Sequence, residues 1–164
     1  MSAATPILWE AYRAAHYAVR MPGGARIMLR PDVAPHASLC SWLGVDKSWA
    51  MLTAWNPRSE PCPAADNRAA TRVLRVALTR RFPAARWLPA QSTAPDGQWR
   101  EVQLLVAGAA RHALAILAWR FGQIAILDGR CGGRVRLRRL DTGLGARLAR
   151  MDSDAAAWAE SAVA

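Results

Sequence analysis

Apolar residues recur along the chain with two spacings, and these spacings predict helices that alternate with strands. A helical period runs over Pro6–Tyr17, and a longer one runs over Cys62–Phe82 with Pro63 at its first turn. A third helical stripe covers Ala110–Phe121. The segment Ala37–Gly44 predicts a further, short helix.

Extended segments lie between these helices. The turn Pro22-Gly23-Gly24 separates two of them and predicts a hairpin. The continuous apolar run Trp49–Trp55 is typical of a buried central strand. A short edge strand is predicted at Trp87–Pro89, because proline is typical of sheet edges, and a longer strand is predicted at Trp99–Gly108. Two further strands are predicted at Gln123–Leu127 and Arg134–Leu140. The glycine-rich connection 128–133 joins these two as a hairpin.

This order of elements predicts a mixed α/β (α+β) fold. We expect a single compact domain over residues 1–141, with a mixed sheet of about five to six strands and helices packed on it. The chain has 164 residues, which suits one domain. Beyond Asp141 the composition turns to Ala, Arg, Asp and Gly, so residues 142–164 are expected to form a C-terminal helix or a loose tail.

Charge adds the possibility of an anionic partner. The formal net charge is +10 and the pI is about 11.3, and a positive field of this kind attracts nucleic acid, nucleotides and other anions. However, Lys47 is the only lysine, and the chain is rich in arginine and alanine, as the codon bias of a GC-rich genome would produce. The charge therefore permits such a partner without requiring one.

Other compositional features narrow the class of protein. No apolar run is long enough to span a membrane, and residues 1–20 lack the basic-then-apolar order of a secretory signal, so we expect a cytoplasmic protein. The three cysteines and three histidines are scattered, which predicts neither a metal site nor a disulfide framework. Phosphate-loop and dinucleotide motifs are missing, so no cofactor is expected. The oligomeric state stays open.

Four short motifs occur in order along the chain, and together they point to a family. They are Thr53-Ala54-Trp55-Asn56-Pro57-Arg58-Ser59, Asn67-Arg68, Pro95-Asp96-Gly97-Gln98-Trp99 with Glu101, and Arg120-Phe121-Gly122-Gln123 with Ala125. With these motifs the chain resembles the bacterial family called domain of unknown function 3293, from about Leu8 to about Leu140. The resemblance supports a single domain and implies no reaction.

Two residues depart from the pattern of that family. Its members typically carry a serine where this chain has Gln103, and an asparagine where it has Ile124. Whatever those polar groups do in the relatives, this chain is expected to do it less well or not at all.

The motifs also predict where a ligand would bind. Three of them begin or end strands, and ligands of open α/β sheets bind in loops at strand ends. We therefore expect a shared cleft with Glu101 as a candidate catalytic residue. The candidate ligand-binding residues are Trp55, Asn56, Ser59, Asn67, Arg68, Trp99, Arg120 and Gln123.

A purely structural role is an open alternative for the same residues. Asn56 and Ser59 would then bond the backbone of their own loop, Asn67 would tie that loop to the helix, and Glu101 would pair with an arginine such as Arg68 or Arg120.

Three functional hypotheses follow. The first is a non-catalytic binding or regulatory module for nucleic acid or a nucleotide-like ligand, and we favour it over an enzyme. The second is a small hydrolase or transferase that uses Glu101 as general base. The third is a protein-interaction domain whose motifs only maintain the fold. Tryptophans near arginines, such as Trp87 and Trp119, could stack on nucleic-acid bases. A position at the rim of the hydrophobic core is the better interpretation of these tryptophans.

Overall fold

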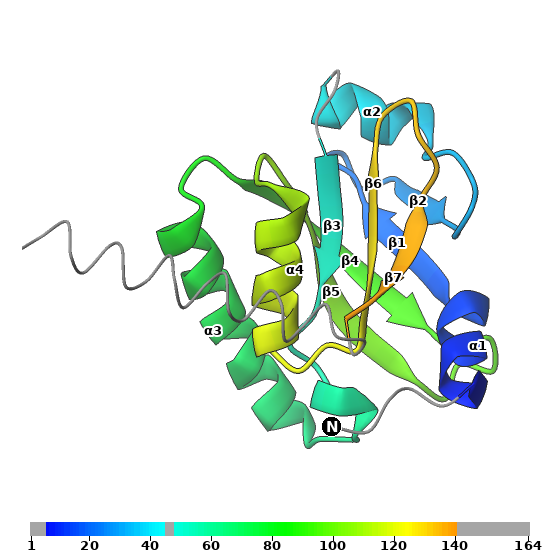
Figure 1. Ribbon diagram of the computed structural model, residues 1–164, viewed down its shortest axis with the longest axis vertical. Helices are drawn as coiled ribbons and strands as arrows, with labels where there is room; N and C mark the ends of the chain where they lie inside the picture. Colours follow the sequence, from blue (N-terminus) through cyan, green and yellow to red (C-terminus); the bar gives the residue numbers. More distant parts are fainter. Residues whose placement is uncertain (1–5, 45–47, 141–164) are drawn as a thin grey trace, which may run out of the picture.

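A seven-stranded sheet with helices on both faces forms the molecule (Figure 1). The computed structural model describes residues 6–44 and 48–140. The sheet has the order β2-β1-β4-β5-β3-β6-β7, and every neighbouring pair is antiparallel. In chain order the elements are α1 (Pro6–Ala14), β1 (His16–Arg20), β2 (Arg26–Leu29), α2 (Ala37–Leu43), β3 (Ser48–Leu52), the 3-10 turn η1 (Pro57–Ser59), α3 (Ala64–Arg81), β4 (Arg86–Thr93), β5 (Arg100–Ala107), α4 (Arg111–Arg120), β6 (Ala125–Arg130) and β7 (Arg136–Arg139).

Two hydrophobic cores lie on opposite faces of the sheet. On one face α3 and α4 lie side by side and cover Leu52, Leu104 and Val106 of the sheet (Figure 1). On the other face α2 packs its buried Leu39 and Leu43 among strand residues. Successive residues of β3 from Trp49 onward, and of β5 from Leu104 onward, are buried in alternate cores, so these stretches are continuous apolar runs in the sequence.

The predicted helices are confirmed, with shifted ends. In α3 the buried Leu74 and Leu78 are one turn apart, while Arg68, Arg72 and Arg75 on the other side are exposed. The helix predicted over residues 6–17 stops at Ala14, because Tyr17 already belongs to β1, where its side chain is buried. The hairpin around residues 22–24 is also confirmed, as β1 and β2.

The sheet differs from the prediction in strand number and direction. It has seven strands instead of about five to six, because the four-residue strands β2 and β7 extend it at both edges. It is antiparallel and not mixed. The helices α3 and α4 join strands that flank a third strand: β3 and β4 both pair with β5, and β5 and β6 both pair with β3. The parallel strands implied by the helical connections therefore never touch.

The prediction of a short edge strand at Trp87–Pro89 was wrong. The strand β4 has eight residues and lies between β1 and β5. The pairing with β1 begins only at Ala90, so around Pro89 the strand has a neighbour on one side alone. Proline has no backbone N–H group to donate, and it is tolerated there because no second strand pairs with this part of β4.

The connection between the last two strands is shorter than predicted. Asp128 and Gly129 continue β6, and only residues after Arg130 form the turn. Gly129 faces Trp49 across the β3–β6 pair, and a Cβ atom at Gly129 would lie 2.7 Å from Cζ2 of the Trp49 ring. An Asp-Gly pair that resembles a turn in the sequence therefore serves close packing inside the sheet.

The described residues also bear on the remaining expectations. None of the helices among them has the length and apolarity that crossing a bilayer requires. The end of the predicted domain at residue 141 and the predicted tail 142–164 lie outside the described ranges.

Candidate functional site

The antiparallel arrangement brings several strand ends together at one end of the sheet. The ends of β3 and β4 lie beside the starts of β1, β5 and β6, as the pairs His16–Thr93 and Thr93–Arg100 show. Three of the four sequence motifs sit at these strand ends. Segments far apart in the sequence therefore meet here, as we expected for the motifs at strand ends.

The loop after β3 has an unusual backbone. Asn56, Arg58 and Ser59 have φ angles of 47°, 60° and 61°, in the left-handed region that non-glycine residues seldom adopt. Each such residue costs about 1 kcal/mol or more, so other contacts must hold the loop. One is the bond from Arg58 N to the carbonyl of Gly122, at 2.8 Å. Gly122 lies so close that a Cβ atom there would be 2.7 Å from Pro57 Cβ.

A pair of asparagines holds the same loop against α3. The Asn56 backbone N–H donates to Asn67 Oδ1, and Asn67 Nδ2 donates back to Asn56 Oδ1, both at 2.9 Å. Asn56 Oδ1 also accepts from the backbone N of Cys62 at 3.0 Å, and Asn67 Nδ2 donates to the Cys62 carbonyl at 3.2 Å. Both asparagines are buried, so each hydrogen bond replaces one that water would otherwise supply.

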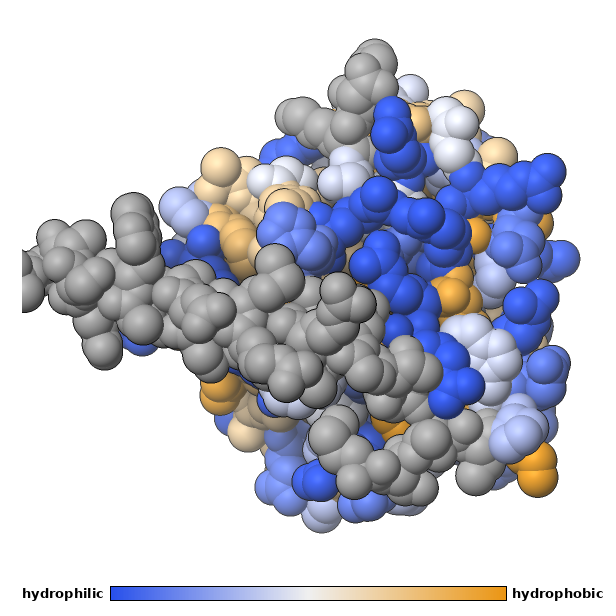
Figure 2. Space-filling model, viewed as in Figure 1, coloured by the Kyte–Doolittle hydropathy of each residue, from blue (hydrophilic) through white to orange (hydrophobic). Residues whose placement is uncertain are grey.

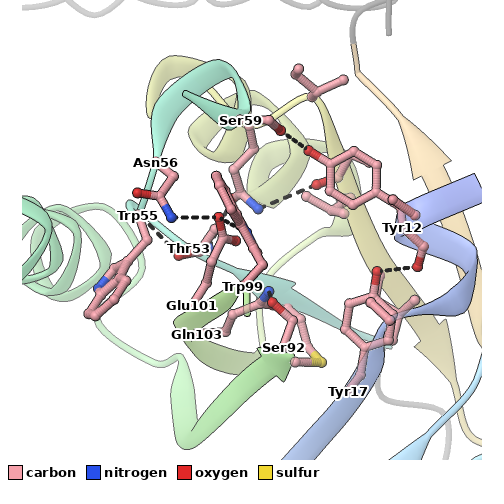
Figure 3. A pocket seen from close by; sticks show the side chains of 18 of the residues that line it. Tyr12, Tyr17, Thr53, Trp55, Asn56, Ser59, Ser92, Trp99, Glu101 and Gln103 are labelled. Carbon is pink, nitrogen blue, oxygen red and sulfur yellow. Dashed lines mark hydrogen bonds between the residues drawn. The ribbon is translucent and has the colours of Figure 1, made fainter. Parts of the chain in front are cut away.

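The remaining donor of Asn56 points to Glu101. Asn56 Nδ2 donates to Glu101 Oε1 at 3.2 Å, and the Trp99 indole Nε1 donates to the same oxygen at 3.0 Å (Figure 3). No group among the described residues donates to Oε2. The Glu101 residue is 8% exposed, and no cation pairs with it within the described parts of the chain.

Burial raises the pKa of Glu101 to about 7, because the charged carboxylate loses most of its hydration. The two hydrogen bonds from Asn56 and Trp99 favour the charged form and offset part of this effect. Burial likewise raises the pKa of Tyr17, and the nearby Tyr12 and Glu101 add to that increase. Glu101 is thus a carboxyl group that can gain or lose a proton near neutral pH.

Glu101 lies in the wall of a pocket with a volume of about 270 Å³. Most of the lining is apolar or aromatic, and it includes residues of every strand end described above. The polar lining groups besides Glu101 are Tyr12, Tyr17, Thr53, Asn56, Ser59, Ser92, Thr93, Gln103 and Gln123.

One wall of the pocket comes from α1, which supplies Leu8, Ala11 and Tyr12. The Tyr12 hydroxyl forms a short hydrogen bond with Ser59 Oγ, and the Tyr17 hydroxyl donates to the Tyr12 carbonyl at 2.7 Å (Figure 3). No residue of α1 is fully buried. The helix is held by these polar contacts at the pocket together with the Arg13–Asp32 ion pair and the Arg139 guanidinium over the Trp9 ring.

Other polar side chains of the lining are bonded to their neighbours. Gln123 Oε1 accepts from Thr53 N at 3.1 Å, and its Nε2 donates to the Ala125 carbonyl at 3.4 Å. Gln103 Nε2 donates to Ser92 Oγ at 2.7 Å. Gln103 Oε1 has no hydrogen bond within the described residues. Gln103 and Glu101 are two positions apart on β5, so both side chains face the same side of the sheet.

The structure brings together six of the nine residues named from the sequence. Those that line the pocket are Trp55, Asn56, Ser59, Trp99, Glu101 and Gln123. Asn67 lies behind Asn56 and acts on the pocket through it. Arg68 and Arg120 are exposed and do not line the pocket. The indole of Trp55 donates to Thr71 on α3 and points away from Tyr12 (Figure 3).

The structural alternative holds for some of these residues and not for others. Asn67 ties the loop to α3, and Asn56 bonds its own loop at Cys62, as that alternative expects. Ser59 instead bonds Tyr12, and Glu101 lies beside Asn56 and Trp99 with no arginine as its partner.

Several lining residues were missed by sequence reasoning. Tyr12 and Tyr17 lie in segments without a motif, and only the pairing of β1 with β4 brings them to the pocket. Ser92 belongs to the strand whose length was underestimated. Gln103 and Ile124, where the resemblance to the family implies a serine and an asparagine, both line the pocket.

Metal ligands do not gather at the pocket. Within residues 6–44 and 48–140, no three His, Cys, Asp or Glu side chains lie close enough together to hold an ion. Asp96, which belongs to the same sequence motif as Glu101, is exposed and accepts a hydrogen bond from Gln98 N in its own turn.

Replacing Asn67 tests the asparagine pair. Asn67→Ala removes hydrogen bonds to Asn56 and Cys62 and leaves buried groups unpaired, so the free energy of unfolding should fall by about 2–4 kcal/mol. The adjacent Arg68→Ala is the matched control and should change it by less than about 0.5 kcal/mol, since Arg68 is exposed. Chemical denaturation measures both, and equal effects would contradict the role given to the pair.

Replacing Glu101 tests the buried carboxyl. Its pKa is about 7 in the folded protein against 4.5 for the unperturbed group, so the folded state binds the extra proton between these values. Stability conferred by this group is therefore present at low pH and lost as the pH rises through about 7. In Glu101→Gln the side-chain oxygen can still accept the hydrogen bonds from Asn56 and Trp99, but the side chain carries no charge. Relative to wild type, this variant should gain about 3 kcal/mol between about pH 5 and pH 8.

The control for this experiment is Glu60→Gln, which changes an exposed glutamate of the neighbouring loop. Its stability difference from wild type should stay constant over the same pH interval. Denaturant unfolding at several pH values gives both curves, and a pH-independent difference for Glu101→Gln would show that the carboxyl does not change its proton affinity on folding.

Comparison with known proteins supports the family suggested by the motifs. Residues 52–126 match the model of the family described as "Protein of unknown function (DUF3293)", and this range contains all four motifs. The comparisons with curated proteins and with solved structures gave no match. The matched range runs from the end of β3 to β6 and includes Asn56, Asn67 and Glu101. The part of the chain from residue 52 to residue 126 belongs to the domain of unknown function 3293 family.

Proposed function

We propose that the protein binds a small organic molecule in the pocket and that Glu101 exchanges a proton with it as general base or acid. The observation that carries this proposal is the arrangement of the carboxyl group. Two donors fix Oε1, no group of the described residues bonds Oε2, and the carboxyl lies in the wall of a largely apolar pocket. An acid–base catalyst needs a pKa near the working pH, and that of Glu101 is about 7.

The geometry supports this hypothesis better than an anionic ligand in the same place. Among the described residues, no arginine, lysine or histidine lines the pocket, although the chain has 22 Lys and Arg residues. An anion would have to lie beside the Glu101 carboxyl without a countercharge in a poorly hydrated site, which is unfavourable. The lining therefore favours an uncharged or cationic ligand in this pocket over a phosphate group.

A model reaction tests whether Glu101 acts as a base in the pocket. The probe 5-nitrobenzisoxazole is flat and uncharged, and a base that removes its ring C–H proton causes the N–O bond to break, which gives a coloured cyanophenolate. We expect wild-type protein to accelerate this ring opening, with a rate that rises as the pH passes about 7. Glu101→Gln should reduce the rate by about 100-fold or more.

The matched control is again Glu60→Gln, whose exposed carboxyl should leave the rate unchanged. Circular dichroism checks that each variant is folded. If folded Glu101→Gln opens the ring as fast as wild type, or if the wild-type protein gives no acceleration over buffer, Glu101 is not a base for molecules in this pocket.

A second candidate function, binding of nucleic acid, is favoured by a different surface. The segment from β6 to β7 carries five arginines: Arg130, Arg134, Arg136, Arg138 and Arg139. Its one acidic residue, Asp128, is buried and pairs with Arg111, Arg136 and Arg138. Figure 2 shows hydrophilic residues gathered over this part of the sheet. Such a surface can contact phosphates without any role for the pocket.

Titration with DNA and RNA oligonucleotides at two salt concentrations tests this candidate. Binding should weaken with salt, and the double variant Arg134→Ala/Arg136→Ala should reduce the slope of log K against log salt by about two. The control is Arg68→Ala/Arg72→Ala, which removes two exposed arginines from α3. Absence of binding at low salt, or equal losses for both double variants, would rule out this surface.

A further inference from the structure

The pocket contains unmatched hydrogen-bond acceptors on one side. Glu101 Oε2 and Gln103 Oε1 have no hydrogen bond within the described residues, while the other polar atom of each of these side chains is bonded. Both residues are buried and project from the same side of β5. Neither oxygen is among the fully buried unpaired atoms of the described residues, so both are accessible from the pocket, and a molecule that fills the pocket can donate to them.

The other groups in the wall do not compete for this role. The Thr53 hydroxyl donates to the Val102 carbonyl, and both polar atoms of Gln123 are bonded to the backbone. The Asn56 side chain is likewise used at both ends. Acceptors near Glu101 therefore remain unmatched, whereas most donors in the wall are already used.

The apolar part of the lining determines which kind of ligand skeleton fits the pocket. Leu8 and Ala11 of α1, Met51 of β3 and Leu127 of β6 are apolar, and the aromatic rings of Tyr12 and Trp99 join them. The volume of about 270 Å³ is near the lower end of the range for ligand pockets, about 300–1,000 Å³. A small, largely apolar body fits this space.

We propose that the ligand class of this pocket is a small arylalkylamine, whose nitrogen donates to Glu101 and Gln103 while its ring lies against the apolar wall. The proposal rests on the proposed function, because it names the molecules with which the Glu101 pocket works. It also gives the pocket a charge preference opposite to that of the surface. Amines are accepted and carboxylates are rejected, because Glu101 is the one carboxylate among the described lining residues and no cation in the described parts of the chain pairs with it.

Three probes with one phenyl skeleton test the charge preference: 2-phenylethylamine, 2-phenylethanol and phenylacetate. The readout is the ¹H–¹⁵N resonance of the Trp99 indole N–H, because this group donates to Glu101 and lies in the pocket wall. At about pH 8 we expect the amine to bind tightest and phenylacetate weakest, with at least about a tenfold difference in Kd between them.

The variant Glu101→Gln separates charge from shape. It should bring the amine and phenylacetate to within about threefold of each other and leave the Kd of the alcohol within about threefold of wild type. Glu60→Gln is the control and should keep the wild-type order, because it changes the net charge of the protein equally outside the pocket.

The outcomes distinguish this proposal from the function on which it rests. If phenylacetate binds as tightly as the amine, or if Glu101→Gln keeps the full preference for the amine, the ligand class is wrong while a small-molecule pocket stands. If none of the probes shifts the Trp99 resonance at millimolar concentration, neither the ligand class nor binding of small molecules in this pocket is supported.

Discussion

The reciprocal hydrogen bonds between Asn56 and Asn67 are the constraint on which the pocket depends. They hold a loop with three left-handed residues against α3, and they leave one amide donor of Asn56 for Glu101. Alanine at position 56 or 67 would leave buried backbone groups unpaired, and aspartate would replace a donor by an acceptor. An amide side chain serves both positions because it both donates and accepts. The fold of the loop and the orientation of the carboxyl therefore have the same cause.

The electrostatics of the protein differ between its surface and its pocket. The net charge of +10 acts over long distances, but salt screens it beyond about 8 Å at physiological ionic strength. Among the described lining residues, Glu101 is the group that carries charge near neutral pH, and low hydration strengthens its effect on anything bound there. The net charge therefore bears on the surface, whereas the ligand of the pocket depends on the residues that line it.

The sequence predicted the elements better than their arrangement. Helical periods located α3 and α4, and turn residues located the β1–β2 hairpin, because these signals are local. The antiparallel order of the sheet depends on contacts between distant segments, which no local pattern contains. The same holds for the site. Asn56, Glu101 and Gln123 stood out through their motifs, whereas Tyr12 and Tyr17 reach the pocket only through the pairing of β1 with β4.

The weak burial of α1 has a consequence for how molecules enter. This helix forms one wall of the pocket, yet none of its residues is fully buried, and the hydrogen bond between Tyr12 and Ser59 joins it to the loop after β3. The Arg13–Asp32 ion pair and the contact of Arg139 with the Trp9 ring also hold the helix. All these contacts lie outside the two packed cores, so a local opening at this edge of the molecule would widen the way to Glu101 while both cores stay intact.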